Sequence, residues 1–317
     1  MGVPVTADNF CRAETDYYFA TIIERDALGK FEHRREVPPV ELKIVRPNRD
    51  TLYSSAVLDL DAGPATISLP DAGARFMSMQ IIDEDHYSQP TRYGGGDYRF
   101  ERKDYDTRYL AVLLRTLVDP NDPEDVARAH ALQDAMRIDQ PGGPGRWEVP
   151  EWDAASQKKV RDALKLLGET LPDMNRAAGR KEEVDPIHHL IVSSTGWGLN
   201  PQRDATYLNV TPPDASDDTR YVLKVPAEVP VDGFWSISVY DAEGFYRKND
   251  LDAYALNNIT AEKDAEGGVT VRFGGCGPGV ANCLPIFPGW NYLVRLYRPR
   301  AEILDGSWAF PEAIPVS

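Results

Sequence analysis

Short apolar runs separated by turn residues dominate the pattern of hydrophobic and polar positions along this chain. Between residues 51 and 83, three such runs are divided by the turn segments 61–64 (Asp-Ala-Gly-Pro) and 70–73 (Pro-Asp-Ala-Gly). Because glycine, proline and aspartate favour turns, this pattern predicts an antiparallel β meander or sandwich rather than βαβ units. The predicted strands are residues 51–60, 65–69, 76–83, 109–118, 207–211, 221–225, 234–240, 269–273 and 292–298.

Helical signals occur at the N-terminus and in the middle of the chain. At Asp122 an N-cap residue precedes Pro123 and two acidic residues, which suit the first turn of a helix and the positive end of its dipole. Elsewhere, apolar residues recur at a spacing of three or four. The predicted helices are residues 6–27, 122–138, 153–169 and 186–194.

The helices of the middle segment separate two strand-rich regions. This order predicts a mainly β fold with two β-sandwich or jelly-roll-like domains, an N-terminal helix and a helical connecting segment. We place an N-terminal β domain with its helical arm at residues 1–150, the helical connector at 151–200 and a C-terminal β domain at 201–317.

The composition disfavours nucleic acid and membranes as binding partners. The chain of 317 residues carries 50 acidic and 35 basic residues, and the net charge of −15 disfavours binding to nucleic acid. No apolar stretch approaches the roughly 18 residues of a membrane span, so we expect no membrane association. The first residues have neither a basic n-region nor an apolar h-region, which predicts a cytoplasmic location, or a periplasmic one if a signal peptide has been removed.

Neither the cysteines nor the usual catalytic motifs indicate a particular reaction. Cys276 and Cys283 could form a bridge in an oxidising compartment, but buried free thiols are the favoured interpretation of these two residues and of Cys11. The sequence has no Gly-x-Ser-x-Gly elbow, no phosphate loop, no His-Glu-x-x-His and no dinucleotide fingerprint. No organic cofactor is therefore evident.

Several blocks carry a family resemblance. Residues 48–60 (Asn-Arg-Asp-Thr-Leu-Tyr-Ser-Ser-Ala-Val-Leu-Asp-Leu) and 77–87 resemble the family catalogued as domain of unknown function 1254. Residues 229–240 and the Gly-Trp-Asn-Tyr and Asp-Gly-Ser-Trp motifs of 289–308 are similar to its usual C-terminal partner, domain of unknown function 1214. The resemblance implies two tandem β-sandwich or jelly-roll-like domains in bacterial proteins that often form homo-oligomers.

The first polar cluster to consider is formed by Asn48, Arg49, Asp50 and Tyr53. An arginine next to an aspartate at a strand start often makes a fixed ion pair and a turn cap. In the functional alternative, Arg49 binds a substrate carboxylate while Asp50 or Tyr53 transfers a proton, because a guanidinium suits bidentate anion recognition.

The run from Asp83 to Tyr87 (Asp-Glu-Asp-His-Tyr) is the most chemically loaded segment. On a strand, alternation would place Asp83 and Tyr87 on one face and His86 on the other. With His189 and His33, His86 is a candidate ligand of a divalent metal, although acidic runs more often cap strand ends and histidines are more often simply hydrogen-bonded.

The C-terminal strands offer binding residues. Alternation puts Trp235 on a core face, whereas Tyr240 lies on a second face that fits either a pocket lining or a solvated surface. Arg295 is expected to be buried and paired with a carboxylate, or directed into a cavity. Trp197, flanked by glycines, is expected to plug a barrel end or to stack on a ligand.

These residues give two hypotheses. In the first, the protein is a small-molecule-binding protein or an enzyme, such as a hydrolase or lyase of a carboxylated metabolite, with its site in or between the β domains. The second is a non-catalytic structural or oligomerisation module. In the first hypothesis the catalytic residues are His86, Asp83, Asp50 and Tyr53, and the substrate-binding residues are Arg49, Tyr87, Tyr240, Trp197 and Arg295.

Overall fold

The computed structural model describes residues 2–42 and 45–316, which divide into two compact units. The first unit consists of Met1–Arg35, Leu52–Leu117 and Glu124–Gln202, and the second of Glu36–Thr51, Val118–Pro123 and Arg203–Ser317. More residues lie in strands than in helices, and the sheets are largely antiparallel, so the predicted mainly β fold class is confirmed.

The first unit contains a five-stranded sheet in the order β1-β2-β7-β4-β5 and a three-stranded sheet in the order β6-β3-β8. Apolar residues of both sheets, among them Leu58, Ile67 and Met79, form one core cluster between them. The strands are β1 (Glu32–His33), β2 (Thr51–Asp59), β3 (Ala65–Leu69), β4 (Met77–Asp83), β5 (Arg92–Tyr93), β6 (Gly96–Phe100), β7 (Tyr109–Leu117) and β8 (Arg137–Asp139).

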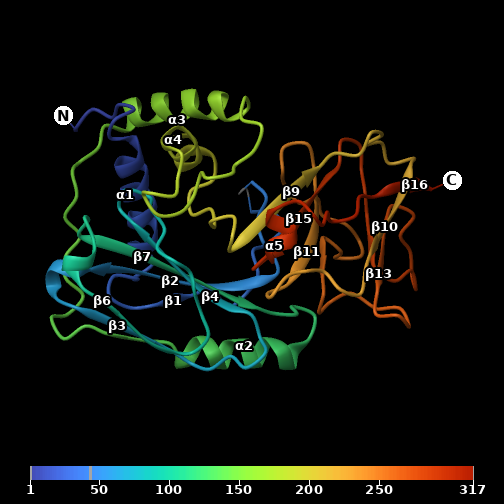
Figure 1. Cartoon of the computed structure of the whole chain (residues 1–317), viewed down its shortest axis with the longest axis horizontal. Helices are drawn as coiled ribbons and strands as arrows, with labels where there is room; N and C mark the ends of the chain where they lie inside the picture. Colours follow the sequence, from blue (N-terminus) through green and yellow to red (C-terminus); the bar gives the residue numbers. More distant parts are fainter. Residues whose placement is uncertain (1, 43–44, 317) are drawn as a thin grey trace. The chain divides into compact units, whose positions relative to one another are not determined.

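Helices cover the opposite face of the larger sheet (Figure 1). Phe19 of α1 (Phe10–Ile23) packs on Val57 and Tyr109 of that sheet. The helices α3 (Ala154–Gly168) and α4 (Pro186–Thr195), which lie in the predicted connector, contact α1 and each other. The remaining α-helix of this unit is α2 (Pro123–Ala135), and the short 3-10 turns are η1 (Leu60–Ala62) and η2 (Arg102–Asp104).

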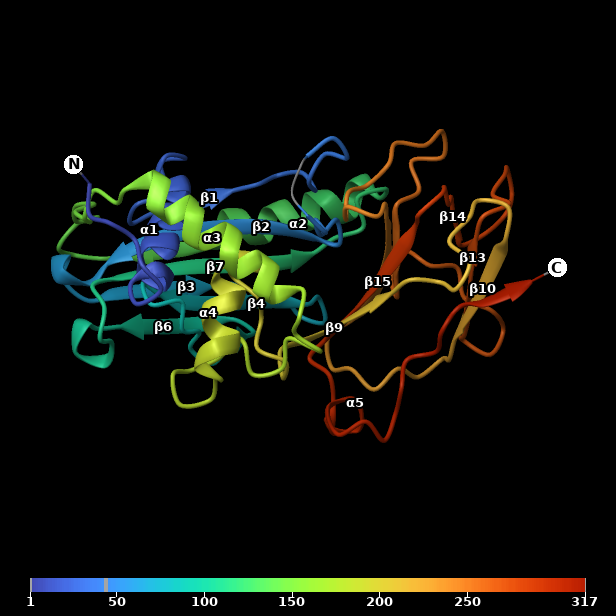
Figure 2. The ribbon, with the colours of Figure 1, turned by 90° about the horizontal axis from the view of Figure 1, so that it is seen from above.

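The second unit is a sandwich of two four-stranded sheets, ordered β14-β13-β10-β16 and β12-β11-β15-β9 (Figure 2). Its core joins residues of both sheets around the fully buried Trp290, whose ring stacks on Phe273 at 5.1 Å. Its elements are β9 (Ala205–Val210), β10 (Arg220–Val225), β11 (Trp235–Tyr240), β12 (Ala255–Asn257), β13 (Val269–Phe273), β14 (Cys283–Leu284), β15 (Asn291–Tyr297), α5 (Ala301–Leu304) and β16 (Ile314–Val316).

Two expectations are corrected. Cys276 and Cys283 form a disulfide, so the favoured interpretation as free thiols is wrong for this pair, while Cys11 is free. The end of the helix predicted at 122–138 is the short strand β8, which pairs with β3 through Ile138 and Ile67. Among the described residues, no helix is long and apolar enough to span a membrane.

Candidate functional site

The predicted site residues fall into two groups, one in each unit. The first unit holds Tyr53, Asp83, His86, Tyr87 and Trp197, with the metal candidates His33 and His189, and the second holds Arg49, Asp50, Tyr240 and Arg295. The described contacts of each group are local to its own unit.

In the first unit, a tight turn follows β4 and replaces the strand alternation expected for residues 83–87. His86 has a φ of 67°, in the left-handed region, and its N–H bonds to the Asp83 carbonyl at 3.0 Å. Asp83 Oδ1 accepts the N–H groups of Asp85 and Tyr87 at 3.0 and 2.9 Å. Burial raises the pKa of Asp83 to about 7, although these two hydrogen bonds act to lower it. Asp83 therefore acts as the cap of this turn.

The bonding of the His86 ring identifies its tautomer. The ring is 2 % exposed, and its Nε2 accepts the N–H of Gly198 at 2.9 Å. The proton of the neutral ring must then sit on Nδ1, which lies 3.1 Å from Ser193 Oγ. Ser193 in turn donates to the His189 carbonyl at 2.9 Å. In this arrangement both nitrogens of His86 are occupied, and Nδ1 donates to the serine rather than accepting its proton.

This arrangement gives a test by NMR. Burial, followed by the neighbouring charge of His189, holds the pKa of His86 well below its ordinary value. We expect the His86 ring to remain neutral with its proton on Nδ1 at about pH 6, where an ordinary histidine is largely protonated. Long-range ¹H–¹⁵N correlation spectra would show this tautomer. A His86 ring protonated at that pH would contradict the assignment.

His189, on α4, lies between two carbonyl oxygens. Its Nδ1 is 3.2 Å from the Ala177 carbonyl and its Nε2 is 3.0 Å from the Asp85 carbonyl, while Tyr87 stacks on the ring at 4.5 Å. A neutral imidazole donates only one hydrogen bond, so both contacts are satisfied only in the protonated ring. Burial lowers the pKa of His189, and the two carbonyls oppose this shift.

The metal candidates do not converge. His86 and His189 stack with ring centroids 5.3 Å apart, whereas His33 lies on β1 and bonds to Ser54 Oγ at 2.8 Å. Within residues 2–42 and 45–316, no three histidine, cysteine or acidic side chains are grouped so that they could hold a metal ion. Trp197 stacks on Tyr18 at 4.5 Å and packs in the core between α1 and the sheet.

In the second unit, Arg295 is the centre of a buried polar network. The side chain is 2 % exposed and donates to Ser238 Oγ at 2.9 Å and to the Tyr240 hydroxyl at 2.8 Å. It also donates to the carbonyls of Arg46 and Pro47 at 3.0 and 3.2 Å. Its hydrogen-bond partners are therefore hydroxyl and carbonyl oxygens rather than the carboxylate expected from the sequence.

Asp50 lies near this network and is itself 1 % exposed. Its Oδ1 accepts the Asn257 amide at 3.0 Å, whereas its Oδ2 and the Ser236 hydroxyl have no well-aligned hydrogen-bond partner among the described residues. Burial raises the pKa of Asp50, and the charge of Arg295 is the main opposing effect. The Arg295 charge thus offsets part of the effect of burial on Asp50.

The remaining predicted residues have structural partners. Arg49 donates to the Pro38 carbonyl and lies over the Tyr254 ring at 5.3 Å. Tyr53, in the first unit, lies beneath the Arg115 guanidinium at 5.5 Å. Tyr240 donates to the Pro47 carbonyl at 2.7 Å and is fully buried, so its face of β11 is covered by the chain.

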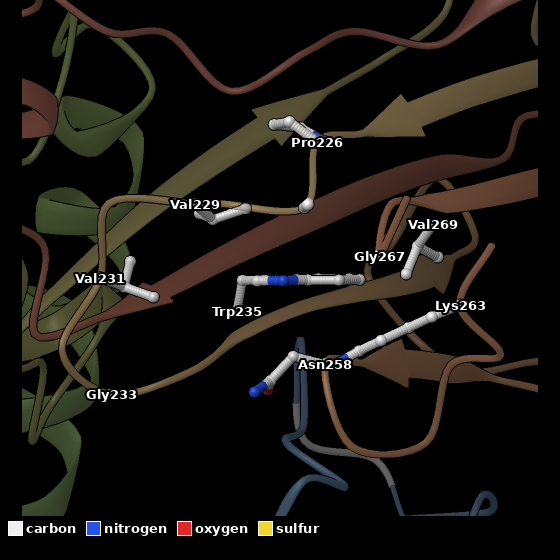
Figure 3. A pocket seen from close by; sticks show the side chains of 10 residues that line it. Pro226, Val229, Val231, Gly233, Trp235, Asn258, Lys263, Gly267 and Val269 are labelled. Atoms are coloured by element: carbon white, nitrogen blue, oxygen red, sulfur yellow. The ribbon is translucent and has the colours of Figure 1, made fainter. Parts of the chain in front are cut away.

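A cavity of about 160 Å³ in the second unit was not anticipated from the sequence. Figure 3 shows the Trp235 ring between valines 229 and 231 on one side and Asn258 and Lys263 on the other. Asn258 follows β12 and Lys263 belongs to the loop before β13, so neither has a strand or helix periodicity that would have marked it. Trp235 was predicted as core, and it packs in the core while its ring also lines the cavity.

Two family models match this chain in tandem. Residues 28–140 match "Protein of unknown function (DUF1254)", and residues 211–301 match "Protein of unknown function (DUF1214)". The chain is a tandem DUF1254–DUF1214 protein. The turn at Asp83–Tyr87 falls in the DUF1254 range, and His189 lies outside both ranges. The cavity residues Trp235, Asn258 and Lys263 fall in the DUF1214 range.

Solved structures share the fold of this DUF1254–DUF1214 protein. The crystal structure of the VPA0106 protein from Vibrio parahaemolyticus superimposes with a TM-score of 0.74 at 18% identity and covers 98% of each chain. An uncharacterised protein from Burkholderia cenocepacia has a TM-score of 0.54 at 15% identity, with coverage of 97% of this chain and 86% of that one. At these identities the likeness shows the fold alone. A search of curated proteins gives no match.

Proposed function

We propose that this DUF1254–DUF1214 protein binds a small molecule in the cavity of its second unit. The observation that carries the proposal is the cavity itself, which is lined by Asn258, a residue whose buried Oδ1 atom has no hydrogen-bond partner among the described residues. A buried acceptor that lacks a partner costs free energy, and rotation of this side chain toward a ligand that donates to it would remove that cost. The adjacent Trp235 ring supplies the apolar surface that is typical of small-molecule sites.

The predicted acid–base residues give weaker support for catalysis. A general acid or base needs a free nitrogen or oxygen within reach of a substrate. His86 has both nitrogens occupied, Asp83 caps a turn, and Asp50 is fully enclosed beside Asn257. Binding without a chemical step is therefore the function we favour over a hydrolase or lyase reaction.

The Arg295 network favours a second candidate, a structural module. The Arg295 guanidinium donates its hydrogen bonds to oxygen atoms of the chain itself. This is expected of a structural module whose buried polar groups are hydrogen-bonded within the protein. In that case the cavity would be incidental, and the two candidates differ in whether it binds anything.

A ligand screen with a cavity-filling variant tests the proposal. We expect a panel of small acids, amines and alcohols to include compounds that shift the backbone amide resonances of the lining residues, such as Ala227, Val231 and Asn258. Val231→Phe should abolish these shifts because the larger ring occupies the space beside Trp235. Lys224→Met, an exposed change on β10, serves as the control. Shifts that are absent, or that persist unchanged in the filled variant, would favour the structural module.

A further inference from the structure

The Cys276–Cys283 disulfide closes a glycine-rich loop between β13 and β14. These two strands pair in parallel, with Arg272 opposite Cys283. Neighbouring parallel strands usually need a connection of about a dozen residues or more, commonly a helix, whereas residues 274–282 connect β13 and β14 without a helix or a further strand. This bridged loop (residues 274–282) contains four glycines, three of them with positive φ. Because glycine loses the most conformational freedom on ordering, the bridge is expected to supply much of the order of the loop.

Hydrogen bonds of the bridged loop are of two kinds. At the tip, the Val280 N–H donates to the Gly277 carbonyl at 3.1 Å, which closes a local β-turn. At the base, the Gly274 N–H donates to the Leu284 carbonyl at 3.0 Å, across the pair of strands. The turn at the tip needs no distant partner, whereas the base bond forms only while the two ends of the loop are held together. Opening of the bridge would therefore loosen the base.

Asn282 of the bridged loop holds the segment beside the cavity. Its Oδ1 accepts the Glu262 N–H at 2.8 Å, and its Nδ2 donates to the Glu262 carbonyl at 2.7 Å. Glu262 directly precedes Lys263, which lines the cavity together with Gly267 of the same segment. Asn282 is next to Cys283 in the sequence, so its position depends on the bridge. The disulfide is thus connected to the border of the cavity through the side chain of Asn282.

The two cysteines of the bridge differ in exposure. Cys283 is 7 % exposed and lies on β14 beside the fully buried Leu284. Cys276 is half-buried, and residues 278–280, which follow it closely, are exposed. Because access helps to select the sulfur that is attacked in thiol–disulfide exchange, an external thiolate should attack Cys276 Sγ.

We propose that the Cys276–Cys283 bridge is a redox-sensitive clasp that fixes the bridged loop and, through Asn282, the segment that borders the cavity. A dithiol opens the clasp. One thiolate of the dithiol attacks Cys276 Sγ and forms a mixed disulfide, while Cys283 leaves as a thiolate and takes up a proton. The second thiolate then attacks the dithiol's own sulfur in the mixed disulfide and releases Cys276, which also takes up a proton. The protein gains two electrons and two protons, and the dithiol becomes a disulfide.

The clasp is closed in an oxidising compartment and open where thiols are kept reduced. Residues 262–267 are then held in place in the first environment and mobile in the second. The order of this segment does not depend on a ligand, so the inference stands even if the cavity binds nothing.

Amide hydrogen exchange, measured by NMR before and after reduction with dithiothreitol, tests the clasp. We expect reduction to speed the exchange of the Gly274 and Glu262 amides by roughly tenfold or more, because one lies at the base of the loop and the other at its Asn282 link. The Gly268 amide donates to Asp264 Oδ1 at 2.7 Å within its own turn. As the internal control, it should change by less than about twofold.

Two outcomes of this experiment would overturn the clasp. If the Gly274 and Glu262 amides exchange at the same rate after reduction, the bridge does not order the loop. If the Gly268 amide speeds up as much as they do, the bridge stabilises the unit as a whole rather than this loop.

Cysteine variants separate the bridge from other effects of the reductant. Cys276→Ser combined with Cys283→Ser should reproduce the exchange rates of the reduced protein without any reductant. Cys11→Ser, which removes the free thiol and leaves the bridge intact, should keep the rates of the oxidised protein. Oxidised-like rates in the double variant would contradict the proposal.

Asn282→Gly tests the link to the cavity border with the bridge intact. Glycine suits the φ of 53° at this position, and the change removes the side chain that binds Glu262. Exchange of the Glu262 amide should become faster, whereas the Gly274 amide should keep its rate. A Glu262 amide that stays protected would show that the link is wrong.

The attacked sulfur is identified by a brief reaction of the oxidised protein with glutathione, followed by acid quenching and peptide mapping. We expect the glutathione adduct on Cys276 to exceed that on Cys283 by about fivefold or more. An adduct mainly on Cys283 would overturn the attack at Cys276.

Discussion

Arg295→Met is expected to lower the free energy of unfolding of the second unit by about 3–5 kcal/mol. The change removes four hydrogen bonds and leaves the Arg46 carbonyl and the Ser238 hydroxyl without this donor. It also removes the positive charge that compensates the buried carboxylate of Asp50. Denaturant unfolding, followed by circular dichroism and tryptophan fluorescence, would measure the loss.

The matched control is Arg272→Met, because Arg272 lies on β13 of the same unit with an exposed side chain. A surface change of this kind is expected to alter stability by no more than about 0.5 kcal/mol. If Arg295→Met costs less than about 1 kcal/mol, the network does not hold the segment at Arg46–Asp50 in place. Arg295→Lys should lie between the two, since one ammonium cannot reach all four oxygens.

The second large effect is a pH dependence that Asp16→Asn should remove. Asp16 is 2 % exposed, and its Oδ2 accepts the Trp152 indole N–H at 2.7 Å. Burial is the main cause that raises the pKa of this carboxyl to about 7, whereas the unfolded chain has a pKa of about 3.9. The folded state therefore holds a proton that the unfolded chain releases. The contribution of protonated Asp16 to the free energy of unfolding is at its full value below about pH 4, and it is lost as the pH rises through 7.

Between about pH 5 and about pH 8, the wild-type protein is expected to lose about 2 kcal/mol relative to Asp16→Asn, which keeps the neutral form at every pH. Denaturant unfolding of both proteins at the two pH values gives this difference, and shared contributions from other groups cancel. Asp8→Asn, an exposed change in the segment before α1, is the matched control for the substitution itself. A wild-type and variant difference that stays constant with pH would contradict the assignment.

The strands that the sequence predicts well are those whose side chains alternate over a core. Residues 65–69 and 269–273 have the predicted bounds because their inward positions are apolar and turn residues flank them. Strands of two or three residues, such as β1, β5 and β14, are too short to show a period. Their pairing depends on the neighbouring strand, so no local pattern indicates them.

The candidate sites depended on information that no local pattern carries. His86 has a left-handed φ, which ends the strand pattern after Asp83 and forms the turn that Asp83 caps. Histidine is enriched in this conformation, but only a few per cent of non-glycine residues adopt it, so the residue type alone does not predict the turn. The carbonyl partners of Arg295 come from residues 248 and 249 positions away in the sequence, so burial was predictable and the identity of its partners was not. The cavity residues Asn258 and Lys263 lie in loops, where apolar and polar positions do not alternate regularly and so predict no orientation of a side chain.

The division of the chain also limits where it can be cut. The second unit includes Glu36–Thr51, a segment that lies more than 150 residues before Arg203 and supplies the carbonyl groups that bind Arg295. A fragment that begins at Arg203 would therefore contain every strand of the sandwich and still lack two of the oxygens that accept hydrogen bonds from Arg295. In such a fragment water would take the place of these carbonyls around a guanidinium that is buried in the full chain, so a fusion that joins residues 36–51 to residues 203–317 is the rational way to isolate this half.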